Sequence, residues 1–353
     1  MRYLKLLLVL VFILTSCRRS VHRPQNKKFP EIVTCWQDNP AQTFHLKNSH
    51  LEPALFSVYN KEYLDSKKLP AVITDRHQSG IFYQTNLLIN DLEEVVTQLQ
   101  KSKKKIKKLD NFTILKQTDY NYLKHTGLMV LRHKKYPFVV KLFMETPENF
   151  VKPFSRGIEE CAFFVMGGGM NRYLAGFTRI PNRNEIQKKI ESNRYWKSLI
   201  DTPRKWFWEP QENRRIFIQG KNIGTQQKSM VLPSIYAIVC DAIESDHGFS
   251  ILRQNDRHLA LSITEFLGIR IDPHINNFMV EKETQKIIII DTEHFPTLIG
   301  IKDDFTINDF ITYYSRLTFR FFTKKLLFDK KNLNALQTHP RPVVYPYEIH
   351  GEK

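Results

Sequence analysis

The sequence predicts an α+β fold in which a small antiparallel β-sheet precedes a mainly helical part. β-rich segments follow one another between residues 112 and 143, and segments with apolar residues at helical spacing flank them. A run of four isoleucines, Ile287 to Ile290, predicts another buried strand. The chain has 353 residues, of which 42% are hydrophobic, so it can bury a large core and is not composed like a disordered protein.

The first 16 residues have the pattern of a signal peptide. Arg2 and Lys5 supply positive charge, and residues 6–14 form an apolar run that is shorter than the roughly 20 residues of a membrane-spanning helix. The tetrapeptide that ends at Cys17 resembles the lipobox of bacterial lipoproteins. This resemblance implies an exported protein of the cell envelope, anchored to membrane lipid through an acylated Cys17. The alternatives are an ordinary cleaved signal and a short uncleaved anchor.

The charge pattern favours a membrane surface over nucleic acid as a partner. The net charge is +17, and five basic residues lie between Cys17 and Glu31, which would attract an anionic lipid surface. The alternative is that they only keep a linker solvated. The excess charge is spread along the chain instead of gathering with aromatic residues on one motif, so nucleic-acid binding is not predicted. The lysine run at 101–108 is interpreted as a solvated helix end or a surface contact.

The chain divides into five predicted regions. They are a signal peptide at 1–16, a proline-broken tether and extension at 17–84, an N-terminal lobe at 85–245 with an insertion at 181–230, a C-terminal lobe at 246–335, and a tail at 336–353.

The N-terminal lobe is predicted to begin with a helix that Asn90 caps. Its apolar stripe is Leu92, Val95, Val96 and Leu99. Strands are predicted at 112–115, 127–132 and 137–143. Thr146 then caps a helix that runs to about Met166 and stops at the glycines 167–169. Further elements are predicted as a strand near 215–219, a buried strand and connector at 231–243, a helix at 257–267, a strand at 287–290 and a helix at 306–327.

The segment from 271 to 293 carries the residues suited to chemistry. Asp272 and Asn277 lie five residues apart in a loop, and Asp291 ends the isoleucine strand. Carboxylate and amide oxygens are hard ligands that suit Mg²⁺, and phosphoryl transfer needs such a metal together with a carboxylate that orients the attacking hydroxyl.

The pattern Asp272-x-His274-x-x-Asn277, followed by Asp291 and Glu293, resembles the catalytic and metal-binding segments of the kinase-like superfamily. It is closer to the branch of aminoglycoside phosphotransferases and choline kinases than to typical protein kinases. The resemblance covers residues 110–330 and implies a two-lobed protein-kinase-like fold that uses ATP and Mg²⁺. Asp272 would then be the catalytic base, and Asn277 and Asp291 would hold the metal.

The same resemblance extends to residues that would bind the nucleotide. Lys141, in an apolar strand, matches the lysine that contacts the α and β phosphates. Glu159 or Glu160 would be its ion-pair partner, and Glu159 is favoured because it shares a helix face with Ala162, Phe163 and Met166. Residues 239–244 would form the hinge. No glycine-rich loop precedes Lys141, and no Ala-Pro-Glu motif follows Asp291, which argues against a regulated protein kinase.

These observations predict a phosphotransferase that acts on a hydroxyl acceptor, which the sequence does not identify. The first alternative is a catalytically inactive kinase-like binding module on the membrane. The second is an unrelated lipoprotein in which Asp272 and Asn277 are turn residues, Asp291 ends a strand, and Lys141 protects a sheet edge. In that case Lys141, Asp272, Asn277 and Asp291 would lie far apart.

Overall fold

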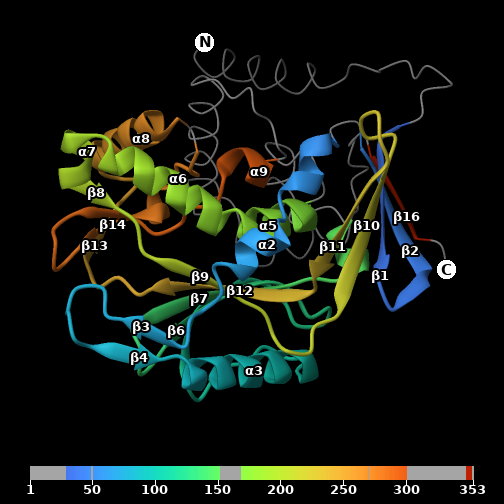
Figure 1. Cartoon of the computed structure of the whole chain (residues 1–353), viewed down its shortest axis with the longest axis horizontal. Coiled ribbons are helices and arrows are strands. Elements are labelled where there is room, and N and C mark those ends of the chain that lie inside the picture. The colour runs from blue at the N-terminus through green and yellow to red at the C-terminus, as the bar shows by residue number, and fades with distance from the viewer. Residues whose placement is uncertain (1–28, 49–50, 152–167, 269, 300–346, 352–353) are drawn as a thin grey trace, which may run out of the picture.

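The computed structural model of the protein describes residues 29–48, 51–151, 168–268, 270–299 and 347–351. Helices and mostly antiparallel sheets are mixed along the chain, so the predicted α+β class is confirmed. Figure 1 shows a central sheet with helices on both faces, a second sheet on one side and a smaller sheet with helices α7 (Arg194–Leu199) and α8 (Gln254–Leu267) on the other. Within the described ranges, no helix has the length and apolar character needed to cross a bilayer.

The central sheet has five strands in the order β5-β6-β7-β12-β9, all antiparallel. Their bounds are β5 Phe112–Asn121, β6 Thr126–His133, β7 Phe138–Met144, β12 Ile235–Asp241 and β9 Lys205–Trp208. The strands predicted at 112–143 and the buried strand within 231–243 are therefore confirmed. Every residue of β12 is buried because strands flank it on both sides and helices cover both faces. The predicted insertion at 181–230 is not separate from this sheet, since it supplies β9.

Helix α3 (Asn86–Lys101) covers one face of the central sheet (Figure 1). Its stripe of Leu92, Val95, Val96 and Leu99 is buried against the sheet, as predicted. The predicted cap at Asn90 is wrong, because the cap is Thr85 and the helix begins at Asn86, five residues earlier than predicted. Leu88 is fully buried and extends the apolar stripe by one turn, so packing fixes the earlier start.

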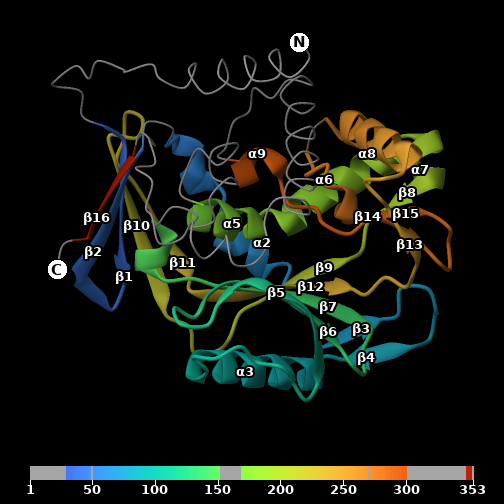
Figure 2. The ribbon, with the colours of Figure 1, turned by 180° about the vertical axis from the view of Figure 1, so that it is seen from behind.

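Helices α5 (Gly168–Phe177) and α6 (Arg179–Glu191) cover the opposite face, as both views show (Figures 1 and 2). Thr146 caps the short α4 (Pro147–Phe150), where its Oγ1 accepts from Asn149 N at 3.2 Å, as predicted. The predicted helix stop at the glycines is wrong, because Gly168 and Gly169 begin α5. A Cβ on Gly169 would lie 2.8 Å from the carbonyl oxygen of Asn149, so glycine permits this close approach.

The second sheet takes in part of the segment 17–84, which was predicted to be a tether and extension. Its order is β11-β10-β1-β2-β16, with β1 Glu31–Trp36, β2 Asn39–Asn48, β10 Arg215–Lys221, β11 Lys228–Pro233 and β16 Tyr347–Gly351. Ile32 and Leu46 are fully buried in the core that also contains Ile216 and Ile218. Residues 31–48 are thus part of the folded protein, and the strand predicted near 215–219 is confirmed.

The remaining sheet contains the hairpin that follows the predicted catalytic loop. Its order is β13-β14-β15-β8, with β13 Ser245–Gly248, β14 Phe278–Glu281, β15 Ile287–Ile289 and β8 Ile200–Asp201. The predicted helix at 257–267 corresponds to α8, and the isoleucine strand corresponds to β15. The smaller elements are η1 Pro53–Ser57, α2 Lys61–Asp65, β3 Val72–Thr74, β4 Phe82–Gln84, η3 Ile275–Asn277 and α9 Phe295–Ile299. Cys17, Glu159 and the helix predicted at 306–327 lie outside the described residues.

Candidate functional site

Asp291, directly after β15 and Ile290, is the centre of a buried ion-pair network. Lys141 Nζ, from the middle of β7, lies 2.6 Å from Asp291 Oδ2. Arg179, the first residue of α6, places Nε 2.9 Å from Oδ1 and Nη2 3.2 Å from Oδ2. The central sheet, a helix on its face and the hairpin loop therefore meet at one carboxylate.

Arg179 links this carboxylate to a second one. Its Nη2 also lies 2.7 Å from Glu293 Oε2, while the guanidinium carbon lies 5.1 Å from the centre of the Phe143 ring. The side chain is 2% exposed, and Nη1 has no hydrogen-bond partner among the described residues. Such a buried guanidinium is stabilised chiefly by the carboxylates around it.

The network shifts the pKa values of Asp291 and Glu293 in opposite directions. Burial opposes the charge of Asp291, but Arg179 and Lys141 outweigh burial and hold the pKa of that carboxyl far below its usual value. Burial raises the pKa of Glu293 to about 7, since the charges of Asp291 and Asp272 add to the effect and Arg179 only partly offsets it. Asp291 is therefore ionised at neutral pH, whereas burial favours the protonated form of Glu293.

The loop that carries Asp272 is tied to the loop that carries Asp291. Asn277 Nδ2 donates to the Asp272 carbonyl oxygen at 3.0 Å, and Asn277 O accepts from Ile290 N at 3.0 Å. The Asp272 carboxylate accepts from His274 N at 3.0 Å. Asp272 is itself 8% exposed. The four predicted site residues are thus held in one region, contrary to the alternative in which they lie far apart.

Helix α6 contacts both of these loops through one side chain. Asn182 Nδ2 donates to the carbonyl oxygens of Arg270 and Thr292, each at 3.0 Å. Burial and the charge of Lys116, in β5, lower the pKa of His274. The site is bounded by both the central sheet and α6.

Sequence reasoning missed Arg179 and Lys205. Lys205 Nζ, from β9, donates to Ile290 O at 3.0 Å, and burial lowers the pKa of this lysine. Lys205 lies in the region interpreted as an insertion, and Arg179 lies just before it. Their partners are 85 or more positions away. The only local signal is a cation among large apolar residues, such as Lys205 before Trp206 and Phe207.

The donor atoms near Asp291 have the chemistry that Mg²⁺ prefers. Asn277 and Asp291 offer an amide and a carboxylate from loops that hydrogen-bond to each other, and Asn277 uses only its amide nitrogen in the bond to Asp272. Across the described part of the chain, no group of three His, Cys, Asp or Glu side chains is arranged to hold a metal. In this structure Lys141 and Arg179 supply the positive charge at these oxygens.

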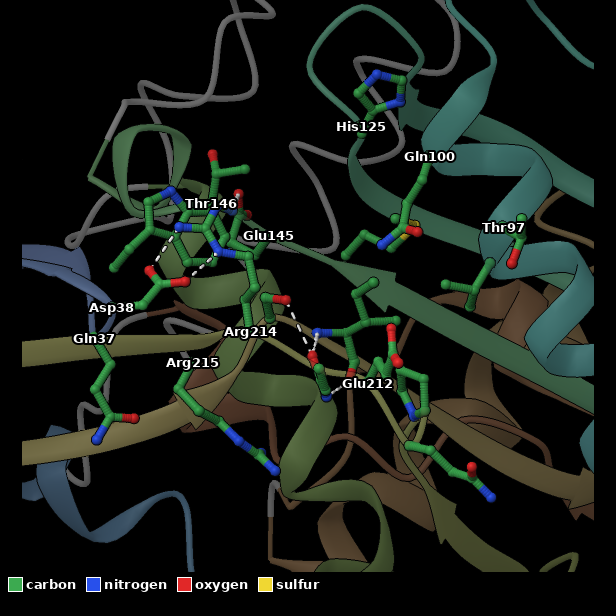
Figure 3. A pocket seen from close by; sticks show the side chains of 18 of the residues that line it. Gln37, Asp38, Thr97, Gln100, His125, Glu145, Thr146, Glu212, Arg214 and Arg215 are labelled. Carbon is green, nitrogen blue, oxygen red and sulfur yellow. Dashed lines mark hydrogen bonds and ion pairs between the residues drawn. The ribbon is translucent and has the colours of Figure 1, made fainter.

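A separate cavity of about 990 Å³ lies between α3, the β1–β2 turn and the β9–β10 loop (Figure 3). Glu145, which follows β7, lines it and is 4% exposed. Its Oε1 accepts from Thr146 N and Asn149 Nδ2, each at 2.9 Å. Burial nevertheless raises the pKa of Glu145 to about 7, because these hydrogen bonds and the charge of Lys124 only partly offset it.

We expect Glu145 to make the protein less stable as pH rises. The folded carboxyl keeps a proton that the unfolded one releases above a pKa of about 4.5, so the free energy of unfolding should fall between about pH 4.5 and 7 and then level off. The group contributes up to roughly 3 kcal/mol of this fall. Urea unfolding across this range should show a shallower slope for Glu145→Gln. An unchanged slope would contradict the assignment, and Glu94→Gln, on the exposed side of α3, is the matched control.

Searches of protein-family models, curated proteins and solved structures find no significant match to the chain. The resemblance to kinase-like proteins therefore rests on the sequence motif of this chain and stays a prediction.

Proposed function

We propose that the chain is a membrane-anchored lipoprotein with a divergent, two-lobed kinase-like domain that transfers a phosphoryl group from ATP to a hydroxyl acceptor. The observation that carries the proposal is the 2.6 Å contact between Lys141 Nζ and Asp291 Oδ2. It joins the middle of the sheet to the end of the hairpin, beside the loop of Asp272. A sheet-edge lysine that only prevents aggregation has no reason to point at a buried carboxylate.

The arrangement of the elements supports two lobes joined by a hinge. β12 ends at Asp241, and residues 242–244 connect it to β13. β13 pairs with β14, the strand that follows the Asp272 loop in the sequence. The segment expected to bind adenine therefore connects the central sheet to the hairpin sheet. α5 and α6 occupy the chain between β7 and β9, where a helix partner for Lys141 is expected.

Each residue has a proposed role. Lys141 contacts the α and β phosphates, Asp272 accepts the proton of the attacking hydroxyl, and Asn277 and Asp291 hold Mg²⁺. The metal, when bound, neutralises charge on the transferring phosphates. The low pKa of Asp291 suits a metal ligand because the carboxylate stays ionised at neutral pH. Glu159 remains the expected ion-pair partner of Lys141, and Cys17 remains the expected lipid anchor.

Nucleotide binding tests the proposal. We expect Mg²⁺-ATP to raise the melting temperature of the chain from residue 18 onward, since a ligand at about 100 times its Kd stabilises by about 2.7 kcal/mol. Lys141→Met and Asp291→Asn should each abolish the shift, measured from the melting temperature of that variant without ligand. Lys135→Met, an exposed lysine in the β6–β7 turn, should keep it. A folded protein that shows no shift would exclude ATP as the ligand.

A catalytically inactive binding module is the second candidate. It is favoured because the carboxylate of Asp291 already has its ion-pair partners within the protein. Both of its carboxylate oxygens are already paired with Lys141 or Arg179, and Glu293 is paired with Arg179 as well. Turnover separates the two candidates. A phosphotransferase should release ADP at a rate that Asp272→Asn lowers by about 10²-fold or more, while a binding module should show no ADP release above background.

A further inference from the structure

We infer that the cavity between α3, the β1–β2 turn and the β9–β10 loop binds an organic cation, an ammonium or guanidinium group on an aliphatic stem. Two sources share this chemistry, a free polyamine and the lysine or arginine side chain of a peptide. The inference is independent of the proposed phosphotransferase, because the cavity and the Asp291 network share no lining residue.

The charges around the cavity leave an acidic surplus. Glu93 on α3, Glu145 after β7 and Glu212 in the β9–β10 loop approach it from three segments, and none forms an ion pair with a described residue. The two arginines of the lining are already neutralised. Arg214 binds both oxygens of Asp38, at 3.0 and 2.6 Å, and Arg215 lies 2.8 Å from Glu209. An acidic cavity in a chain of net charge +17 therefore favours a cationic ligand over an anion.

Glu145 supplies the buried contact of this site. The residue is 4% exposed, and both hydrogen bonds it accepts fall on Oε1. Its Oε2 accepts none from the described residues. A buried carboxylate without a cation is costly to ionise, so a bound ammonium or guanidinium would gain the interaction that the protein itself does not provide.

The rest of the lining suits an aliphatic stem. Trp36, Val96, Met144, Pro210 and Ile235 are apolar surfaces of the same cavity. The Trp36 ring already attracts a cation, since the guanidinium carbon of Arg214 lies 3.9 Å from its centre. Figure 3 shows Glu145 and Glu212 among the side chains that line the cavity, together with the Arg214–Asp38 pair. The volume of about 990 Å³ is that of a small-molecule site.

Titration calorimetry with the full chain in detergent at about pH 8 tests the inference. The probes are spermidine and the tripeptide acetyl-Ala-Lys-Ala-amide, with 1-pentanol and glutarate as neutral and anionic controls. We expect saturable binding of at least one cationic probe and of neither control. Tighter binding of spermidine would indicate a free amine, and tighter binding of the tripeptide would indicate a side chain. Saturable binding of glutarate, or of no cationic probe, would overturn the inference.

Variants locate the binding. Glu145→Gln should weaken binding of the cationic probe by about tenfold or more, because a charge-assisted hydrogen bond is replaced by a neutral one. Glu212→Gln, at an exposed position that can change without loss of the fold, should weaken it by several-fold. Glu94→Gln should leave it unchanged. Equal affinity in all three variants would place the cation elsewhere and overturn the inference, whatever the outcome with ATP.

Discussion

Replacement of Arg179 by methionine should lower the free energy of unfolding by about 3–5 kcal/mol at neutral pH. Methionine keeps most of the aliphatic volume but removes a guanidinium that contacts Asp291 and Glu293 inside the protein. Lys141 would remain as the nearest cation for Asp291, and Glu293 would lose its ion-pair partner. The cost arises from the charges left behind, not from lost packing. Urea unfolding, followed by circular dichroism, measures it.

Two variants make this result specific. Arg194→Met replaces an exposed arginine at the start of the next helix, α7, and should change the free energy of unfolding by less than about 0.5 kcal/mol. In a Glu293→Gln background, Arg179→Met should cost measurably less than in the natural chain, since the two side chains are in contact. A loss below about 1 kcal/mol for Arg179→Met alone would contradict the central place given to this network.

The elements that the sequence predicts well are those whose buried residues form a local pattern, either a helical stripe or a continuous apolar run. The stripe of α3 repeats at helical spacing, and the apolar runs of β12 and β15 are long enough to require burial on both sides. The start of α3 was misplaced because Asn90 resembles a cap, while the decisive contact is that of Leu88 with the sheet. β1 and β2 were hidden because prolines surround them and their pairing partners include residues more than 180 positions away.

Some residues of the candidate site are likewise predictable from the sequence, and others are not. Asp272, Asn277 and Asp291 lie within twenty residues in a spaced motif, so the sequence alone suggests that they act together. Arg179 is separated from Asp291 by 112 positions and begins a helix with few apolar residues. Its importance depends on the carboxylates that the fold brings to it. A lone arginine in a polar segment carries no signal of that burial.

The second large effect is expected at Gly176, near the end of α5. A Cβ there would lie 1.8 Å from the Tyr236 hydroxyl oxygen and 3.1 Å from Cε1 of Phe143. The tyrosine cannot move aside easily, because its ring is stacked on Phe143 at 4.7 Å and on Phe177 at 4.0 Å between centres. Gly176→Ala should therefore destabilise the protein by about 3 kcal/mol or more, although alanine favours a helix by about 1 kcal/mol.

The partner variant identifies the cause of that loss. Tyr236→Phe removes the oxygen that the new methyl group would meet, so the double variant should recover part of the stability that Gly176→Ala loses. Recovery should be incomplete, because the Cβ would still lie 2.8 Å from Cζ of the ring. Gly248→Ala is the matched control, since nothing lies within 4 Å of its added Cβ. If Gly176→Ala is as stable as this control, α5 does not pack against β12 as closely as the structure requires, and the position of Arg179 after α5 would lose its support.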